Sequence, residues 1–270
     1  EIPLRLVGSE MCIRDSIKKE EIMSTIPRVI HYFWFGSNPK PEIVIKCIAS
    51  WKKYMPDWEI KEWNENNYDV HCCEYVEQAY AAKKWAFVSD YARFDILNRY
   101  GGLYLDTDVE ILKEIPTKYF ESPFTAVDNN GVVAPGLIVA LPCKHWLSQL
   151  VLDSYCNDKF QDGKLTVEDT INTRVKEILL QKGYEIKNDY QKIQDMIIYP
   201  SELFCGFDVN THEYDITSKT LSVHHYASSW MTDKQLKKRK IQSKIKKAFG
   251  ISTYKKLLRF KRAIFGISKE

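Results

Sequence analysis

Residues 89–109, SDYARFDILNRYGGLYLDTDV, decide the fold of this chain. They begin inside a long helical pattern over residues 79–99, which places four side chains on one face at the 3.6-residue period: Ala86, Asp90, Arg93 and Leu97. Gly101-Gly102 ends the helix, because glycine adopts the left-handed conformation of a helix cap at little cost. Leu103–Leu105 is then a short strand that delivers an Asp-x-Asp turn, residues 106–108, to its carboxyl end, where ligands bind in open α/β sheets.

The sequence on either side alternates between strand and helix patterns. Residues 27–36 form a β-branched and aromatic run, residues 41–54 have helical spacing, and residues 58–63 alternate as a strand. A β-α-β start favours a parallel α/β sheet. Further strands are predicted at 124–127, 132–140, 196–199 and 221–226, and further helices at 144–155 and 170–182. Since no internal repeat or low-complexity linker interrupts these patterns, residues 23–230 are predicted to form one α/β domain.

The Asp106-Thr107-Asp108 turn is the strongest candidate for chemistry. Two carboxylates at positions i and i+2 can converge through a turn and hold a hard divalent cation. A cation there would neutralise a diphosphate and stabilise it as it leaves. The tripeptide alone is more often a solvated turn, so the surrounding motifs must decide between the two interpretations.

Three segments, in this order, resemble glycosyltransferase family 32: residues 26–36 (IPRVIHYFWFG), 89–97 (SDYARFDIL) and 101–109 (GGLYLDTDV). The family includes bacterial capsular and lipopolysaccharide sugar transferases and is similar to the glucosyltransferase domains of large clostridial toxins. The resemblance implies an A-type glycosyltransferase fold, a Rossmann-like sheet flanked by helices that binds a nucleotide sugar.

The resemblance also implies a reaction. The enzyme would be a hexosyltransferase that uses Mn2+ or Mg2+ and retains the anomeric configuration. The donor would be a nucleotide sugar, most commonly a UDP-sugar, although GDP-mannose remains open. The acceptor would be a glycan or a lipid-linked saccharide in capsule, lipopolysaccharide or other cell-surface polysaccharide synthesis.

Four residues are expected to be catalytic by this resemblance: Asp90, Arg93, Asp106 and Asp108. Asp90 would accept hydrogen bonds from sugar hydroxyls, and Arg93 would reach the sugar or the phosphates of the donor. Asp108 is the expected direct metal ligand, while Asp106 would meet the sugar or ribose and hold a metal-bound water. An i,i+3 ion pair on the helix is the alternative interpretation of Asp90 and Arg93.

The donor pocket is expected to combine aromatic and polar side chains from separate segments. Trp34 would stack on the nucleobase, an interaction worth roughly 1–3 kcal/mol, and core packing is the alternative for this residue. The backbone near His31 to Phe33 would line the same pocket. The full set of expected donor-binding residues is His31, Phe33, Trp34, Ser89, Asp90, Arg93, Tyr104, Asp106, Ser228 and Trp230.

Residues 221–230, LSVHHYASSW, resemble the closing segment of the family. His225 is the expected metal or diphosphate ligand beside Asp106 and Asp108, and an imidazole ligand favours manganese over magnesium. Ser228 would contact the diphosphate, and Trp230 would close over the leaving phosphate. A surface histidine pair is the alternative, and the sequence gives only a slight preference for His225 over its neighbour His224.

Charge is distributed unevenly along the chain. Residues 231–270 hold 14 Lys and Arg against two acids, which leaves 25 bases and 34 acids for residues 1–230. The acidic body argues against a nucleic acid partner. The tail has the pattern of a basic amphipathic helix, which predicts peripheral membrane contact, with packing on the domain as the alternative.

Cysteine usage and the N-terminus bear on location. Seven cysteines follow no zinc or disulfide spacing, which predicts reduced thiols and a cytoplasmic location. Membrane contact by the basic tail would place the protein at the inner face of the membrane. Residues 1–22 lack the apolar core of a secretory signal and are predicted to be a non-native extension before Met23.

Two other functions compete with a transferase. A membrane-tethered glycan-binding module would use the aromatic residues as sugar platforms without catalysis. A haloacid-dehalogenase-type phosphatase also begins its motif with apolar-Asp-x-Asp, but its fifth position is usually Thr or Val and here is Glu110. The chain departs from the family pattern at residues 134–137 and 169–173, which help shape the acceptor side, so the acceptor stays open.

Overall fold

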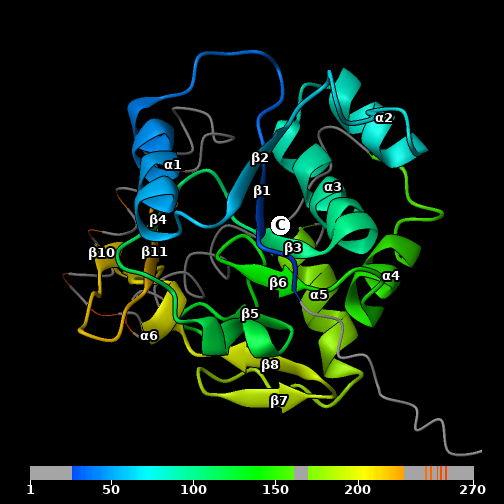
Figure 1. Cartoon of the computed structure of the whole chain (residues 1–270). Helices are drawn as coiled ribbons and strands as arrows, with labels where there is room; N and C mark the ends of the chain where they lie inside the picture. Colours follow the sequence, from blue (N-terminus) through cyan, green and yellow to red (C-terminus); the bar gives the residue numbers. More distant parts are fainter. Residues whose placement is uncertain are drawn as a thin grey trace, which may run out of the picture.

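Seven strands form the central sheet of the computed structural model, in the order β2-β1-β3-β6-β5-β8-β7 (Figure 1). The structure describes residues 26–160 and 170–227 together with the single positions 241, 244, 248, 250 and 253. The strands of the sheet are β1 (Val29–Phe33), β2 (Glu59–Trp63), β3 (Gly102–Tyr104), β5 (Phe124–Ala126), β6 (Val139–Leu141), β7 (Gln191–Ile193) and β8 (Met196–Tyr199). β1 is parallel to β2 and β3, and β6 is antiparallel to both of its neighbours. The carboxyl ends of β1, β3 and β5 therefore lie along one edge.

Helices cover both faces of this sheet. The described helices are α1 (Glu42–Tyr54), α2 (Glu74–Ala81), α3 (Trp85–Tyr100), the 3-10 helix η1 (Thr117–Glu121), α4 (Trp146–Asp153), α5 (Ile171–Leu180) and α6 (Ser201–Phe204). One core cluster joins Phe33 and Tyr104 to side chains of α2–α5, and the other joins Ile30 and Leu103 to Trp51 of α1. Because successive strand residues point to opposite faces, α1 packs on one face and α2–α5 on the other.

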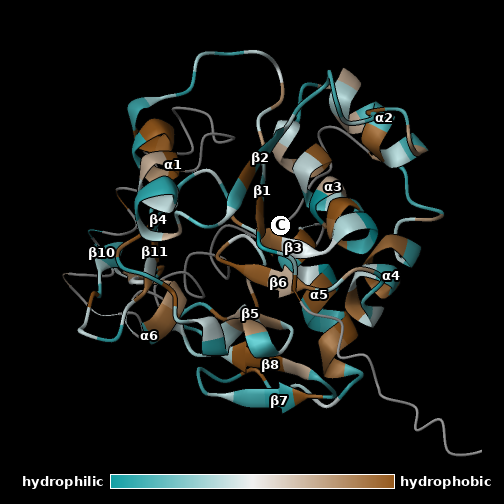
Figure 2. Cartoon of the chain, in the orientation of Figure 1, coloured by the Kyte–Doolittle hydropathy of each residue, from teal (hydrophilic) through white to brown (hydrophobic). Residues whose placement is uncertain are grey.

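The predicted α/β class and its β-α-β start are confirmed. β1, α1 and β2 follow one another in the chain, and β2 lies parallel to β1 with Ile60 opposite Ile30. In Figure 2 the inner strands β6 and β8 are brown, whereas the edge strand β7 is teal. Strands buried between two helical layers need apolar residues on both sides, and an edge strand does not.

Two predicted elements differ from the structure. The helix predicted over residues 79–99 is instead the end of α2 and the whole of α3, separated by a turn in which Lys83 has a positive φ of 57°. The strand predicted over residues 132–140 shrinks to β6, preceded by an isolated bridge between Val133 and Val127. Pro135 lies between these two pieces and has no N–H to donate to a ladder.

A separate two-stranded ladder brings the far end of the chain to the Asp-x-Asp turn. β4 (Val109–Ile111) pairs antiparallel with β11 (Ser222–His224), so that His224 lies opposite Val109. Helix α1 anchors β4, because the Trp51 indole donates to Val109 O at 2.7 Å. A second small ladder joins β9 (Phe207–Asp208) to β10 (Glu213–Tyr214).

Some predictions concern parts of the chain outside this description. The N-terminal extension (residues 1–22), the basic tail apart from single positions, and the limits of the domain at residues 23 and 230 all fall there, and they stay predictions. None of the helices within the described ranges has both the length and the hydropathy needed to cross a membrane.

His31 links β1 to two neighbouring strands from inside the core. It is 2% exposed, its Nε2 lies 2.9 Å from Gly101 O, and the Trp63 indole donates to its Nδ1 at 3.1 Å. A ring that accepts at Nδ1 donates from Nε2 and is neutral. Burial lowers the pKa of His31 to about 4, despite the Gly101 carbonyl, which favours the charged form.

This pKa predicts acid-sensitive stability. The unfolded chain takes up a proton at His31 near the ordinary pKa of 6.5, whereas the folded chain does so only near 4. The stability contributed by the neutral ring is therefore present above pH 6.5 and lost as pH falls towards 4, by up to about 3 kcal/mol. Urea unfolding of wild type and His31→Gln between pH 7 and 4 measures the difference in unfolding free energy, which should shrink by this amount. His71→Gln, at an exposed histidine, is the control; equal pH slopes for wild type and His31→Gln would contradict the assignment.

Candidate active site

Asp106 stands at the carboxyl edge of the sheet, two residues beyond the end of β3. Its backbone N–H donates to Gly136 O at 3.1 Å, in the loop before β6. A Cβ added at Gly136 would lie 2.1 Å from Asp106 Oδ2 and 2.9 Å from its Cγ, closer than real Cβ atoms approach other groups. The loop before β6 therefore packs directly against this carboxylate at Gly136, a contact that we call the Gly136 wall. A side chain at position 136 would collide with the carboxylate in its present position.

A buried network holds the Asp106 carboxylate. Arg93 Nη2 lies 2.7 Å from Asp90 Oδ1 and 3.4 Å from Asp106 Oδ1. The Tyr104 hydroxyl donates to the same Asp106 oxygen at 2.7 Å, and Arg93 Cζ lies 4.5 Å from the centroid of the Tyr104 ring. Burial raises the pKa of Asp90 to about 6, against the opposing effect of Arg93. The i,i+3 pair considered from the sequence exists, but it is buried and extends to the Asp-x-Asp turn.

Asp108 is held by the segment that follows β11. Its Oδ1 lies 2.9 Å from His224 Nε2, and its Oδ2 accepts the Ala227 N–H at 2.7 Å. Burial favours the neutral carboxyl, but the His224 ring and the backbone N–H outweigh it and lower the pKa of Asp108 to about 2. Burial likewise disfavours the charged imidazole, yet the Asp108 carboxylate raises the pKa of His224.

Asp106, Asp108 and His224 form one group whose potential ligand atoms lie within 4.8 Å of one another. His224 Nε2 faces both carboxylates, at 2.9 Å from Asp108 and 3.7 Å from Asp106. Its Nδ1 is buried and has no hydrogen-bond partner among the described residues. Two carboxylate oxygens and one imidazole nitrogen are ligands that Mn2+ accepts. The residues present therefore fit a divalent cation.

The structure corrects the predicted metal ligand His225. Val223 lies opposite Glu110 in the ladder, and His225, two residues further on, points to the side of Glu110. Its Nε2 lies 2.9 Å from Glu110 Oε2, and its Nδ1 lies 2.7 Å from the Tyr214 hydroxyl. Because neighbouring residues of an extended segment point to opposite sides, His224 faces the two aspartates and His225 faces away.

Trp34 lies at the same edge as the Asp-x-Asp turn, one residue past the end of β1. Its side chain is partly buried, its indole N–H donates to Asn38 O at 2.7 Å, and Lys40 Nζ lies 5.8 Å from its ring centroid. The hydrogen bond fixes the orientation of the ring. Phe33 differs, because its side chain is buried in the core against Phe35, so a contact to a donor would come from its backbone.

The other expected donor-binding residues divide into three cases. The Ser89 hydroxyl donates to Ala86 O within α3, while its carbonyl accepts from Arg93 Nε at 3.2 Å. Both ring nitrogens of His31 form hydrogen bonds inside the fold, to Gly101 O and to the Trp63 indole. Its side chain therefore has no polar atom left to bind the donor substrate. Ser228 and Trp230 lie outside the described residues, and their predicted roles stay predictions.

Sequence reasoning missed Gly136 and preferred His225, whereas the structure places His224 beside the two aspartates. Gly136 lies in the 134–137 segment, which stood out only as a departure from the family pattern, and its role depends on contact with a residue 30 positions away. Neighbouring residues of a strand point to opposite sides, so the sequence did indicate that only one of His224 and His225 faces the aspartates. Which one does so depends on the register of β11 against β4, which the sequence does not reveal.

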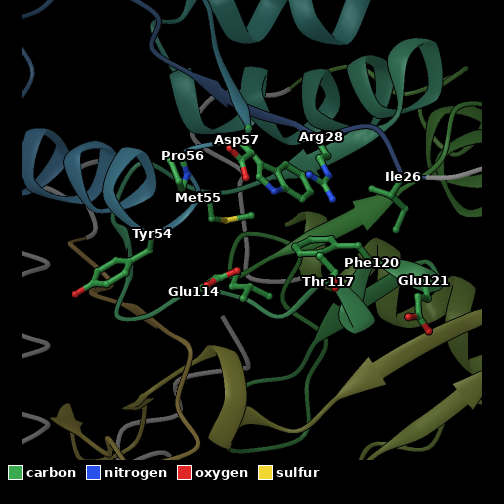
Figure 3. A pocket seen from close by; sticks show the side chains of 12 residues that line it. Ile26, Arg28, Tyr54, Met55, Pro56, Asp57, Glu114, Thr117, Phe120 and Glu121 are labelled. Atoms are coloured by element: carbon green, nitrogen blue, oxygen red, sulfur yellow. The ribbon is translucent and has the colours of Figure 1, made fainter.

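A cavity of about 290 Å3 lies at the opposite edge of the sheet, near the starts of β1 and β2 (Figure 3). Figure 3 shows Arg28, Tyr54 and Asp57 on one side of it and Phe120 and Glu121 on the other. Arg28 immediately precedes β1, so this cavity is separated from the Asp-x-Asp turn by the length of the strand. It takes no part in the candidate active site.

The fold and the site agree with the predicted class. The parallel strands β2, β1 and β3, continued by the antiparallel strand β6, carry an Asp-x-Asp turn at their carboxyl edge, which is the arrangement expected for an A-type glycosyltransferase. The α/β fold class is therefore confirmed.

Comparison with known proteins shows that part of the chain is similar to a protein family. Residues 8–135 match the model of a family described as capsular polysaccharide synthesis protein. This segment contains Trp34, Asp90, Arg93 and the Asp-x-Asp turn, so over this part the chain is similar to capsular polysaccharide synthesis proteins, in agreement with the capsule-type resemblance predicted from the sequence.

Similar solved structures carry transferase titles. "PaToxG Glycosyltransferase" is 20% identical, with 58% of this chain and 70% of that chain covered and a TM-score of 0.46. A glycosyltransferase involved in the glycosylation of the major capsid of PBCV-1 is 11% identical, with 79% and 98% covered and a TM-score of 0.44. No curated protein matches this chain.

The Gly136 wall predicts a strong effect from one methyl group. In Gly136→Ala the new Cβ displaces the Asp106 carboxylate, so Mn2+ affinity measured by titration calorimetry should fall at least about tenfold. Gly183→Ala controls for a general loss of stability on glycine replacement, because its added Cβ meets nothing within 4 Å while its φ of +95° strains the backbone, far from the aspartates. Thermal unfolding checks that both variants are folded. Wild-type Mn2+ affinity in folded Gly136→Ala would show that the position of Asp106 does not matter for the ion.

Proposed function

We propose that this protein is a metal-dependent glycosyltransferase that moves a hexose from a nucleotide sugar to a glycan or lipid-linked saccharide in capsular polysaccharide synthesis. One observation carries the proposal: Asp106, Asp108 and His224 converge at the carboxyl edge of the sheet, beside the buried Asp90–Arg93 pair. The match of residues 8–135 to capsular polysaccharide synthesis proteins supports the pathway class.

Asp106, Asp108 and His224 are the residues that would hold Mn2+ or Mg2+. A divalent cation bound there would neutralise charge on the leaving diphosphate. Asp108 accepts a backbone N–H and faces an imidazole, so it stays ionised well below neutral pH and is ready to bind a cation. Asp106 is held in place by Tyr104 and the Arg93 guanidinium, which leaves Oδ2 facing His224.

Arg93 supplies a second, permanent positive charge behind the carboxylates. Its guanidinium is buried between Asp90 and Asp106, in a low dielectric where its field is strong. Charge placed in advance near a departing phosphate lowers the barrier as the anomeric bond breaks. Asp90 completes this arrangement and, as proposed from the resemblance, accepts hydrogen bonds from the transferred sugar.

The proposed stereochemical outcome is retention. We suggest attack by the acceptor hydroxyl on the face of the sugar from which the diphosphate departs, with a leaving phosphate oxygen accepting the hydroxyl proton. The acceptor oxygen forms the new bond to the anomeric carbon, and the diphosphate leaves with the electron pair of the old one. Determination of the product anomer by NMR tests this outcome against inversion.

The acceptor and the cellular location complete the proposal. A lipid-linked acceptor at the inner face of the membrane would suit a chain whose last 40 residues are strongly basic. Liposome pelleting of intact and tail-deleted protein with anionic lipid tests this contact, and equal binding of the two would remove the tail from the proposal.

Thermal shift measurements separate this function from its two rivals. A transferase should be stabilised by UDP or GDP only together with Mn2+, because the cation joins the diphosphate to the aspartates. A glycan-binding module would respond to glycan alone, and a phosphatase would release phosphate from simple monoesters. A donor-hydrolysis screen across sugar nucleotides with Mn2+ then identifies the donor.

Removing the central carboxylate should abolish transfer without unfolding the chain. In Asp108→Ala, donor hydrolysis and transfer should fall below detection, since the cation loses a ligand. The variant also loses the Asp108 contacts to His224 and Ala227, so thermal unfolding checks that it is folded. Asp153→Ala, on the exposed end of α4, is the matched control. Full activity in a folded Asp108→Ala variant would refute metal dependence.

Loss of the Trp34 ring should weaken donor binding and leave metal binding intact. Stacking of a base on an aromatic ring is worth roughly 1–3 kcal/mol, so the Kd for the nucleoside diphosphate in Trp34→Ala should rise about 5- to 150-fold. Trp34→Phe keeps a stacking face and should lose much less. Calorimetry with UDP and with GDP, each at saturating Mn2+, checks the effect; an unchanged Kd would mean that Trp34 only packs.

A further inference from the structure

A chain of polar side chains lines the side of the β4–β11 ladder that faces away from the aspartates. Lys46 Nζ lies 2.8 Å from Glu110 Oε2, His225 Nε2 lies 2.9 Å from the same oxygen, and the Tyr214 hydroxyl lies 2.7 Å from His225 Nδ1. These four residues come from α1, β4, β10 and the end of β11. We call them the latch.

The centre of the latch is partly buried, whereas Lys46 and Tyr214 at its two ends are exposed. The side chains of Glu110 and His225 are 17% and 12% exposed, and one carboxylate oxygen serves two donors. Both nitrogens of the His225 ring are engaged, which fixes its orientation. Burial opposes ionisation of Glu110, but Lys46 and His225 outweigh it and lower the pKa of this carboxyl.

The backbone of the latch residue His225 connects directly to the candidate metal site. Its N–H donates to Asp108 O at 2.9 Å, and two residues later the Ala227 N–H donates to Asp108 Oδ2 at 2.7 Å. On its other side, His224 places its ring against both aspartates. Fixing the His225 ring therefore fixes the backbone that carries the histidine and N–H groups of the site.

The ladder is short but not isolated. β4 and β11 pair over only three residues each, the Trp51 indole holds β4, and the His224 N–H donates to Cys205 O at 3.0 Å. The latch adds side-chain contacts beyond the end of the three-residue pairing. A register slip by one residue would exchange the sides of His224 and His225. Side-chain contacts across the pair are the interactions that stabilise one register over another.

We propose that Glu110, with Lys46, His225 and Tyr214, positions His224 and Asp108 for the metal by holding the end of β11 in register against β4. Glu110 is thus a positioning residue that acts through His225. This inference rests on the proposed metal-dependent function, but its structural part concerns the fold of the metal-free chain and is tested separately.

The first test is hydrogen exchange of the metal-free protein. In Glu110→Ala the amide protection of the peptide covering residues 222–227 should fall at least about tenfold, because the Asp108-bonded N–H groups open more often. Glu77→Ala is the matched control, since Glu77 also bonds a histidine, His71, at 2.9 Å but on an exposed surface. Unchanged protection of residues 222–227 in Glu110→Ala would overturn the latch.

The second test is Mn2+ affinity, measured by calorimetry with the metal alone. Glu110→Ala and His225→Gln should each weaken binding about tenfold, in the range for groups that orient ligands. The double variant should be no weaker than the weaker single variant, because both changes break one unit. Glu110→Gln keeps an acceptor oxygen for Lys46 and should recover most of the affinity.

The outcomes distinguish this inference from the function on which it rests. If Glu110→Ala binds Mn2+ like wild type while His225→Gln does not bind it, then His225 is itself a ligand and the latch is wrong. If wild-type protein binds no Mn2+, the proposed metal site fails, and the exchange experiment alone decides whether the latch holds β11.

Discussion

The candidate site depends on keeping two aspartates within reach of one ion although their charges repel. Asp106 and Asp108 are separated by one residue, and the fold gives each carboxylate a nitrogen partner from a different element. Arg93 of α3 holds Asp106 from within the core, and His224 of β11 holds Asp108 from the far end of the chain. These contacts and the Ala227 N–H favour the ionised form of Asp108 and lower its pKa although it is largely buried.

Two separate strand pairings bring distant segments of the chain together at the candidate site. The central sheet places β1 beside β3, so that Trp34 and the Asp-x-Asp turn emerge from neighbouring strands at one edge. A separate two-stranded ladder then returns residues 222–224 to residues 109–111. Under the proposed function, this shared edge lets one nucleotide diphosphate meet both a base-stacking ring and the two carboxylates.

The β4–β11 ladder also gives the adjacent residues His224 and His225 different partners on its two sides. His224 meets the aspartates, while His225 joins Glu110, Lys46 and a tyrosine on the other side. Because the pairing covers only three residues on each strand, we infer that the polar contacts beyond its end help to hold in place the side that faces the aspartates. Gly136 limits Asp106 as well, through close contact with its carboxylate and a hydrogen bond from the Asp106 N–H to Gly136 O.

Sequence alone determined the α/β class, the β-α-β start and the presence of a carboxylate pair at a strand end, because hydrophobic period and glycine placement are local properties. It also singled out Asp90 and Arg93, whose helical spacing puts them on one face. Only the tertiary structure decided that His224 and not His225 faces the aspartates, since this depends on a register between segments more than 100 residues apart. The same holds for Gly136, whose importance is set by an atom of another loop that no local pattern specifies.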